Sequence, residues 1–452
     1  MEASQAPMLR GWLPLLGVLP ALARDSLSVF ERARALGDIV QLAVPGLHPV
    51  FVLATPAHIR HVLQDNHANY RRAPIHDRLK VVLGEGLLTS DGELWRRQRR
   101  LLQPAFRAER IRRFVAAMAA SAVNLAEAWE AGAAHNRILD VSQEMSDLTL
   151  DIAVRCMFGR EQRGGDAAIS RALLEVQEWI AARFWSIAPT WMERLPTPAN
   201  RRFRRALAVL DAAVEGIVTA RLATRDVGND LLGMLLAAQG QDGNGIDAHQ
   251  VRDEAMTMLL AGHETSAAAL TWTWHLLALH PQVAEAVRDE LAQILHGRAV
   301  PDADDLSRLE LTRAVLQEAM RLYPPAGWIP RLAAGPDQIG DYNIPAGAIL
   351  VLSPWLVQRD PRFWPDPERF DPARFAPTER PAPYTYFPFG GGPRTCIGTH
   401  FAMTEMLVAL AVLVPRIRLR HASDEPIVPK LRITLRPAGG VPMCVERLVR
   451  SG

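Results

Sequence analysis

The sequence predicts a mainly α fold with a minor β region. From about residue 92 to residue 322, apolar residues recur at helical spacing with few interruptions. Near the N-terminus, two short apolar runs have the composition and turn boundaries of strands. Prolines crowd residues 324–388, as expected of a long irregular connection. Helices should therefore form the body of the molecule, with small sheets at one side.

The expected elements follow in chain order. The first strands are Asp38–Val44 and Pro49–Ala54, and a later strand covers Ala348–Leu352. A strand pair around residues 437–440 should close the chain. Helical periodicity marks nine segments, namely Trp95–Gln103, Ile111–Ala131, Val141–Phe158, Ile169–Phe184, Arg201–Leu222, Val251–Leu279, Gln282–Leu295, Leu309–Leu322 and Ile397–Val414.

The sequence shows no linker that would divide the chain into separate domains. Length alone favours two or three domains, but no low-complexity linker splits the 452 residues. We expect one domain over residues 1–452. Its β-rich parts should lie near 37–60, 324–360 and 420–447, and its helical parts near 92–322 and 397–414.

Composition excludes several classes of protein. Hydrophobic residues make up 49% and charged residues 22%, which are ordinary globular values. A net charge of +2 is too small to indicate a nucleic-acid partner. The apolar stretch Gly11–Ala23 is shorter than the roughly 20 residues that span a bilayer, and Pro14 and Pro20 interrupt it. It also lacks the preceding basic segment of a signal peptide, so we expect no transmembrane anchor.

The strongest motif surrounds Cys396, within Phe389-Gly-Gly-Gly-Pro-Arg-Thr-Cys-Ile-Gly398. Three cysteines make neither a disulfide framework nor a zinc site, which indicates a reducing, intracellular setting, and the expected lack of a membrane span suggests a cytoplasmic enzyme. A buried cysteine is usually an inert small side chain. Here, however, glycines permit close backbone approach, and a predicted helix begins just after the sulfur and stabilises a thiolate. Arg394 can pair with a carboxylate beside that thiolate. The pattern therefore favours a ligand.

This decapeptide resembles the haem-binding loop of the cytochrome P450 family, soluble bacterial type, and the resemblance covers nearly the whole chain. It implies a triangular-prism helical body with small sheets and one haem b, iron protoporphyrin IX. Cys396 is then the iron ligand, with Phe389 and Gly398 beside the haem. A thiolate ligand favours O–O cleavage.

Arginines are expected to hold the haem propionates. Trp95 and Arg99 lie four residues apart, on one helix face, and both donate hydrogen bonds. The resemblance implies that this pair meets the propionates, together with Arg331 and Arg394.

The neighbouring Arg96, Arg97 and Arg100 allow two interpretations. They form either a solvated basic face or a surface that docks an acidic ferredoxin. The chain ends 56 residues after Cys396, so we expect no fused reductase and a separate ferredoxin-type electron donor for a monomeric enzyme.

Ala261-Gly-His-Glu-Thr265 lies inside the expected helix Val251–Leu279. Glycine and threonine inside a helix indicate a bend, with Glu264 in solvent as one interpretation. By resemblance, Ala261 faces the haem, Thr265 hydrogen-bonds dioxygen and Glu264 relays protons. His263 is expected to be a packing residue.

Glu318-Ala-Met-Arg321 matches the family's E-x-x-R pattern, a string that occurs elsewhere in the chain as a surface pair. Among these copies, we take Glu318–Arg321 as the family motif because it lies just before the proline-rich stretch. Pro367-Glu-Arg-Phe370 then suggests Arg369 as the third member of a buried ion network.

The substrate pocket is expected to be apolar. By resemblance it lies along the loop Ile75–Thr89, the helix near 170–190, the long helix, the segment Ala326–Ile329 and Ile433–Thr434. About half of the candidates should be plain core residues. Phe184, Trp185, Ile187 and Trp191 are expected to form a mobile lid. The candidate pocket residues are Val82, Leu83, Phe184, Met258, Ala261, Trp328, Ile329 and Ile433.

These features predict a monooxygenase that inserts one atom of O₂ into a small lipophilic substrate. Two alternatives keep the haem: a haem-thiolate isomerase, dehydratase or coupling oxidase, and a haem sensor or binding protein. A third is a helical protein without a cofactor. Fatty acids, terpenoids, steroids and polyketides remain open as substrates.

Overall fold

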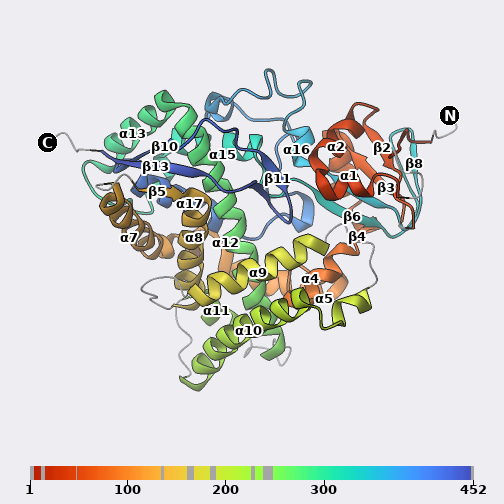
Figure 1. Ribbon diagram of the computed structural model, residues 1–452, viewed down its shortest axis with the longest axis horizontal. Coiled ribbons are helices and arrows are strands. Elements are labelled where there is room, and N and C mark those ends of the chain that lie inside the picture. The colour runs from red at the N-terminus through yellow and green to blue at the C-terminus, as the bar shows by residue number, and fades with distance from the viewer. Residues whose placement is uncertain are drawn as a thin grey trace.

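The computed structural model describes residues 5–11, 16–46, 48–133, 137–159, 167–183, 190–224, 230–237 and 248–448. Helices form most of the body, and the largest sheet lies at one end of it (Figure 1). The long helix α12 (Ala248–Leu279) runs through the middle of the molecule. The mainly α prediction is confirmed.

The largest sheet joins segments from both ends of the chain. Its strand order is β1-β2-β3-β9-β6-β4. β2 and β3 are antiparallel, and β9 joins β3 in parallel from about 300 residues later. The strands are β1 (Met8–Leu9), β2 (Ile39–Leu42), β3 (Val50–Leu53), β4 (Tyr70–Arg72), β6 (Ile329–Ala333) and β9 (Ile349–Leu352).

Three smaller sheets complete the β structure. The first has the order β10-β13-β5, and the others are the hairpins β7-β8 and β11-β12. Their strands are β5 (Ile138–Asp140), β7 (Asp337–Ile339), β8 (Tyr342–Ile344), β10 (Ile417–His421), β11 (Pro429–Leu431), β12 (Leu435–Pro437) and β13 (Pro442–Arg447).

The expected long helices are all present. α8 (Val141–Phe158) has the predicted bounds because both of its ends are capped. The Asp140 carboxylate accepts from the Ser142 amide at 3.0 Å, and Gly159 takes a left-handed conformation after the last turn. The others are α5 (Gly92–Leu102), α7 (Val115–Ala133), α9 (Ala167–Arg183), α10 (Pro198–Thr224), α13 (Pro281–Leu295), α15 (Glu310–Leu322) and α17 (Thr399–Leu413).

Short helices fill the connections between these elements. They are α1 (Leu19–Arg24), α2 (Ser26–Arg34), α3 (Pro56–Arg60), α4 (Ile75–Leu83), α6 (Ala108–Ile111), α11 (Leu231–Ala237), α14 (Asp305–Arg308) and α16 (Pro354–Val357).

Two local predictions were wrong. The segment Ile75–Thr89 is not all loop, since it begins with helix α4. The strands beside residues 437–440 do not pair with each other: β12 pairs with β11, and β13 pairs with β10 and β5. Gly439 and Gly440 both have positive φ, and the Val441 amide donates to Asp140 at 2.8 Å. The glycine turn therefore sends the chain from one sheet to another.

Separate hydrophobic cores lie on the helical and β-rich sides. The helical core includes Phe401 of α17, whereas a core on the β-rich side includes Leu63 and Phe387. Residues 388–400 connect these two cores. Cys396 thus lies between them.

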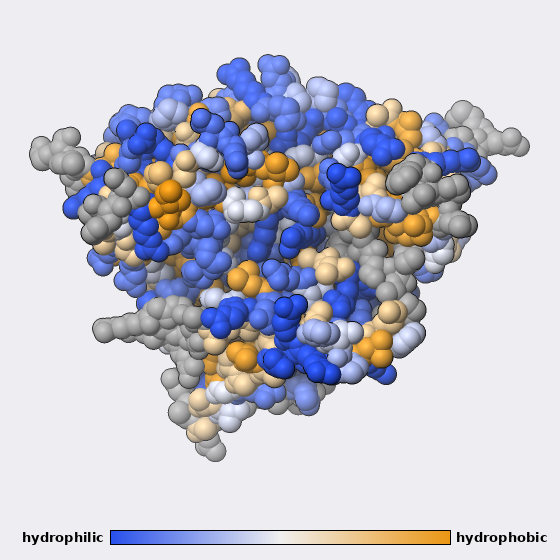
Figure 2. All heavy atoms as spheres, in the orientation of Figure 1, coloured by the Kyte–Doolittle hydropathy of each residue, from blue (hydrophilic) through white to orange (hydrophobic). Residues whose placement is uncertain are grey.

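No helix in the described part of the chain is long and apolar enough to cross a membrane. Polar side chains cover most of the face seen in Figure 2, and apolar side chains are scattered over it in small groups.

Candidate active site

The loop before Cys396 is held by backbone contacts. The Cys396 amide donates to the Phe389 carbonyl at 2.9 Å, which closes the loop on itself. Gly392 has a φ of +65°, and a Cβ there would lie 1.7 Å from the Leu63 carbonyl oxygen. Only glycine fits both conditions. This glycine therefore allows the loop to rest directly on the chain at Leu63.

The Cys396 side chain is exposed, yet protein surrounds it at longer range. Its sulfur therefore borders an open space inside the molecule. Enclosure raises the pKa of the Cys396 thiol, while the Gly398 amide, the positive charge of Arg99 and the Thr399 hydroxyl act to lower it. The surroundings of the sulfur thus include an amide, a hydroxyl and a positive charge that all favour the thiolate over the thiol. α17 begins at Thr399, two residues later than predicted.

Helix α12 also borders open space near its middle. Ala261 is exposed, whereas Leu259 and His263, two positions before and after it on the helix, are buried. Thr265 is half-buried, and its hydroxyl donates to the Ala261 carbonyl at 2.9 Å. Such a bond draws a carbonyl away from the helix ladder. Small side chains leave this face of the helix uncovered, as a flat cofactor requires.

Arg394 and Arg331 form part of an enclosed cationic cluster. The Arg394 guanidinium bonds the Asp91 carboxylate and stacks 4.2 Å from the centre of the Trp95 ring. Arg331 is buried, and burial together with repulsion from Arg394 lowers its pKa to about 10. Arg99 lies close enough to Cys396 for their charges to interact.

Arg72 and His76 belong to this cluster, although the sequence prediction missed them. Burial and the charges of Arg331 and Arg394 push the pKa of Arg72 well below its usual value. Among the residues that the structure describes, none forms a hydrogen bond with its Nε. Burial also lowers the pKa of His76, which lies 3.5 Å from an Arg72 nitrogen. No local pattern separates Arg72 from the many surface arginines, so only the folded structure could find it.

The cluster has more positive than negative charge. Asp91 is the one carboxylate in the described residues that acts on Arg72, Arg331 and Arg394. Buried charges are stable only when paired, and arginine suits carboxylates especially well. The residues present therefore fit a bound group with two carboxylates, such as the haem expected from the resemblance.

Glu264 is not in solvent. Its side chain is buried, and its Oε1 accepts from the Thr434 hydroxyl at 2.6 Å and lies 2.9 Å from an Arg436 nitrogen. The alternative of a solvated Glu264 is therefore wrong. His263 is buried, with Nδ1 3.0 Å from the Leu259 carbonyl oxygen, which confirms its packing role.

The Glu318–Arg321 pair is fully buried, with N–O distances of 2.6 and 2.8 Å. The assignment of Arg369 to this network was wrong, because its side chain is 68% exposed and faces Asp371. Arg374 takes its place, 3.6 Å from Glu318 and only 14% exposed. The pattern Pro-x-Arg-Phe occurs twice, at 367–370 and 372–375, and the second copy reaches the core.

The expected pocket residues divide into two groups. Val82, Leu83, Met258 and Trp328 are buried core side chains in this structure. Ile329 is half-buried, and its Cδ1 lies 3.7 Å from where a Cβ on Gly390 would be, so it borders the cysteine loop.

Other predicted residues lie elsewhere. Ile433 lines a separate polar pocket that also contains Glu264. Phe184, Trp185 and Ile187 fall outside the described residues, whereas Trp191 of the expected lid is 60% exposed.

Around a haem, these residues would each have a separate task. A haem with a thiolate ligand supplies oxygen activation and O–O cleavage. Arg72, Arg331 and Arg394 would bind and orient its carboxylates. The Thr265 hydroxyl, which donates to the Ala261 carbonyl in this structure, would turn to donate to a ligand on the haem side, and Glu264 would hold or release a proton.

The chain matches known proteins over nearly its whole length. The family described as "Cytochrome P450" matches residues 7–444. Cyclooctatin synthase of Streptomyces melanosporofaciens is 36% identical, over 99% of this chain and 98% of that protein. Cyclooctat-9-en-7-ol 5-monooxygenase of the same organism is 36% identical over 92% of each chain. Pentalenene oxygenase of Streptomyces avermitilis is 32% identical, over 95% of this chain and 97% of that protein.

One solved structure is also similar. The crystal structure of the cytochrome P450DA heme domain superimposes with a TM-score of 0.89 and 27% sequence identity, covering 99% of both chains.

Proposed function

Because the chain belongs to the cytochrome P450 family, we propose that it inserts one oxygen atom from O₂ into an apolar cyclic olefin or its alcohol. The family and the named relatives establish a haem monooxygenase. Our proposal concerns the substrate class, the haem type, the electron donor and the role of each site residue.

One observation carries the proposal. The Cys396 sulfur borders internal open space, and beside it lies an enclosed cluster of arginines whose positive charge exceeds the negative charge of the carboxylate that acts on it. Cys396→Ser tests it, with Cys444→Ser as the matched control. We expect Cys396→Ser to lose the red-shifted carbonyl band of thiolate-bound ferrous haem, whereas Cys444→Ser keeps it. If Cys396→Ser keeps that band, another residue is the ligand.

Haem b is proposed because its two propionates match the excess of arginine charge around Asp91. Acid extraction followed by mass measurement identifies the porphyrin. A recovered porphyrin without two free carboxylates contradicts this assignment.

The substrate class rests on the relatives and on the few polar groups expected near the reaction site. One relative is named for pentalenene and another for cyclooctat-9-en-7-ol, an olefin and an olefinic alcohol. A panel of cyclic terpenoid hydrocarbons, fatty acids, steroids and polyketides can be screened by the optical shift on displacement of water from the haem. We expect the terpenoids to bind most tightly, and tighter binding of fatty acids contradicts the proposal.

Thr265 and Glu264 are proposed to supply protons for O₂-dependent turnover, with Thr265 nearer the haem and Glu264 behind it. Turnover under ¹⁸O₂ tests this chemistry. One labelled atom per product molecule supports monooxygenation. An unlabelled product favours the isomerase or dehydratase alternative, and ligand-dependent spectra without turnover favour a haem sensor.

A ferredoxin-type protein is the proposed electron donor. Arg96, Arg97 and Arg100 are exposed on α5, the helix that also carries Arg99 near Cys396. The double variant Arg97→Glu/Arg100→Glu should slow reduction by ferredoxin, and the wild-type rate should fall with added salt. An unchanged, salt-independent rate removes this assignment.

A further inference from the structure

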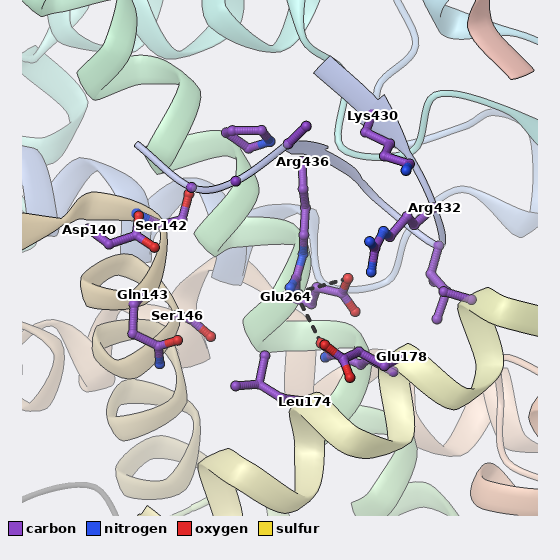
Figure 3. Close-up of a pocket in the computed structure, with 17 residues that line it drawn as sticks. Asp140, Ser142, Gln143, Ser146, Leu174, Glu178, Glu264, Lys430, Arg432 and Arg436 are labelled. Carbon is purple, nitrogen blue, oxygen red and sulfur yellow. Dashed lines mark hydrogen bonds and ion pairs between the residues drawn. The ribbon is translucent and has the colours of Figure 1, made fainter. Parts of the chain in front are cut away.

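Segments far apart in the chain meet at both sides of the candidate site. In Figure 3, Arg436 extends from β12 along α12 and ends at Glu264. The cysteine loop, residues 389–396, is contacted in a comparable way by residues 61–65 and by Tyr384. These two contacts reach the loop from the β-rich side of the molecule.

Tyr384 lies against the backbone of the cysteine loop. A Cβ on Gly391 would collide with the Tyr384 ring, so the ring packs directly on this glycine. Burial raises the pKa of the Tyr384 hydroxyl, and a hydrogen bond from the Gly392 amide to its oxygen acts against this rise. The hydroxyl itself donates to Oε1 of Gln64 at 2.9 Å. One side chain thus joins two consecutive glycines of the loop to the segment 61–65.

The backbone of Tyr384 is in an unfavourable conformation. Its φ is +62°, in the left-handed region, where a bulky side chain is uncommon. Such a conformation persists only when the surrounding contacts hold it, and examples are concentrated at functional sites. This conformation places the ring on Gly391 and the hydroxyl between Gly392 and Gln64.

The segment that receives the Tyr384 hydroxyl is itself fixed at both ends. Residues 61–65 form a π-helical turn directly after α3, a rare conformation that is frequent at functional sites. Oδ2 of Asp337, on β7, lies 2.8 Å from Nε2 of His61 at the start of the turn. The same oxygen accepts from Nδ2 of Asn66, directly after the turn, at 3.0 Å. The turn is therefore a firm support for the loop.

The position of Gly392 determines the position of Cys396. Gly392 begins a 3₁₀ turn that ends at Arg394, and its carbonyl accepts from the amide and the hydroxyl of Thr395, at 3.1 and 2.7 Å. The Cys396 amide donates in turn to the Phe389 carbonyl. These bonds make the loop one rigid unit, so a displacement at Gly392 also moves the sulfur.

We propose that Tyr384, supported by Gln64 of the π-helical turn, fixes the position of the Cys396 sulfur relative to the haem iron. Tyr384 is a positioning residue, since it acts through Gly391 and Gly392. The inference rests on the proposed role of Cys396 as the iron ligand. Electron donation from the sulfur depends on the iron–sulfur distance, and residues around a metal ligand commonly orient it.

The first test compares Tyr384→Ala with Tyr342→Ala in the haem-loaded protein. Both tyrosines are half-buried and pack against the same hydrophobic core. Among the described residues, however, Tyr342 of β8 forms no hydrogen bond or ring contact with the cysteine loop. X-ray absorption measures the iron–sulfur distance, and the ferrous carbonyl spectrum gives the fraction of haem with a thiolate ligand.

We expect Tyr384→Ala to lengthen the iron–sulfur distance and to lower the fraction with the red-shifted band severalfold, because nothing then fixes the loop at Gly391. Tyr342→Ala should match wild type in both measurements, although it also removes a ring from the core. Equal distances and equal spectra in the two variants overturn the proposal.

The second test isolates the hydroxyl from the ring. Tyr384→Phe keeps the ring on Gly391, and Tyr384→Phe and Gln64→Leu both remove the hydrogen bond between residues 384 and 64. Each should give a carbonyl spectrum between wild type and Tyr384→Ala, and a haem reduction potential more positive than wild type, because the sulfur donates less charge.

Tyr386→Phe is the matched control for Tyr384→Phe, since no described residue forms a hydrogen bond with the Tyr386 hydroxyl. It should leave the spectrum and the potential unchanged. Wild-type values for both Tyr384→Phe and Gln64→Leu overturn the role of the hydroxyl.

Cys396→Ser separates the two levels of inference. If this variant keeps the red-shifted band, the proposed iron ligand is wrong and the role of Tyr384 fails with it. If it loses the band while Tyr384→Ala keeps the wild-type distance and spectrum, Cys396 is the ligand and Tyr384 does not position it.

Discussion

Arg374 and Arg369 offer a comparison in which exposure alone should decide the effect on stability. Arg374 lies 3.6 Å from Glu318, and Arg369 lies 3.7 Å from Asp371. Arg374 is 14% exposed beside a fully buried acid, whereas Arg369 is 68% exposed. We expect Arg374→Gln to destabilise the protein markedly more than Arg369→Gln.

The magnitudes follow from Coulomb's law. At an effective dielectric constant of about 20, two charges at this distance attract by about 5 kcal/mol, and in water by about 1 kcal/mol. Part of the larger value is offset because the variant no longer has to desolvate a charged arginine, and Arg321 still pairs with Glu318. We therefore expect a loss of about 2 kcal/mol for Arg374→Gln. For Arg369→Gln we expect less than about 0.5 kcal/mol.

Chemical denaturation is the suitable assay. In a chain of this length, about 1 kcal/mol changes the melting temperature by only about 1 °C. The urea midpoint, followed by tryptophan fluorescence and by the haem absorption of the holoenzyme, resolves the two variants better. Equal midpoints, or a lower midpoint for Arg369→Gln, would refute the assignment of Arg374 to the core network.

Three further outcomes are expected. The Arg72→Leu variant should lose haem to a scavenger protein about 10- to 100-fold faster than wild type, because it lacks a charge-assisted hydrogen bond to the cofactor. The control variant Arg71→Leu, at an exposed position, should lose haem at the wild-type rate. Equal rates for the two variants would exclude Arg72 from the haem site. Burial raises the pKa of Glu405 to about 8, above its value in the unfolded chain, so the free energy of unfolding should fall as the pH rises from about 5 to 8. The Glu405→Gln variant should show a weaker dependence of stability on pH. An unaltered dependence in this variant contradicts the argument. Gly392→Ala should give protein with little bound haem by absorbance, because its Cβ would collide with Leu63; full haem content refutes the need for this close approach.

The long helices could be predicted because each buries a continuous apolar face. Val141–Phe158 has the periodicity of a packed helix and a cap at each end, so its bounds are determined locally. α4 was missed because its nine residues include His76, Asp77, Arg78 and Lys80, a composition that resembles a loop. Its packing against distant parts of the chain decides its conformation.

The site shows the same division. Cys396 could be predicted because its glycine-rich setting is contained in ten consecutive residues. The contact from Thr434 to Glu264 joins residues 170 positions apart, and no local sequence pattern predicts it. The choice between two Pro-x-Arg-Phe copies also depends on which arginine the fold turns inward. Long-range charge pairing is therefore what sequence reasoning could not supply.

The position of Cys396 between two cores has a consequence for chimeric proteins. Gly392 contacts the chain at Leu63 on the β-rich side, and α17 packs Phe401 into the helical core. A cofactor bonded to this sulfur would lie where the β-rich core and the helical core meet, and would contact both. Exchanging either body for that of a relative should succeed only if the Leu63 and Phe401 contacts are exchanged together with the loop, since a mismatch there would displace Cys396 itself.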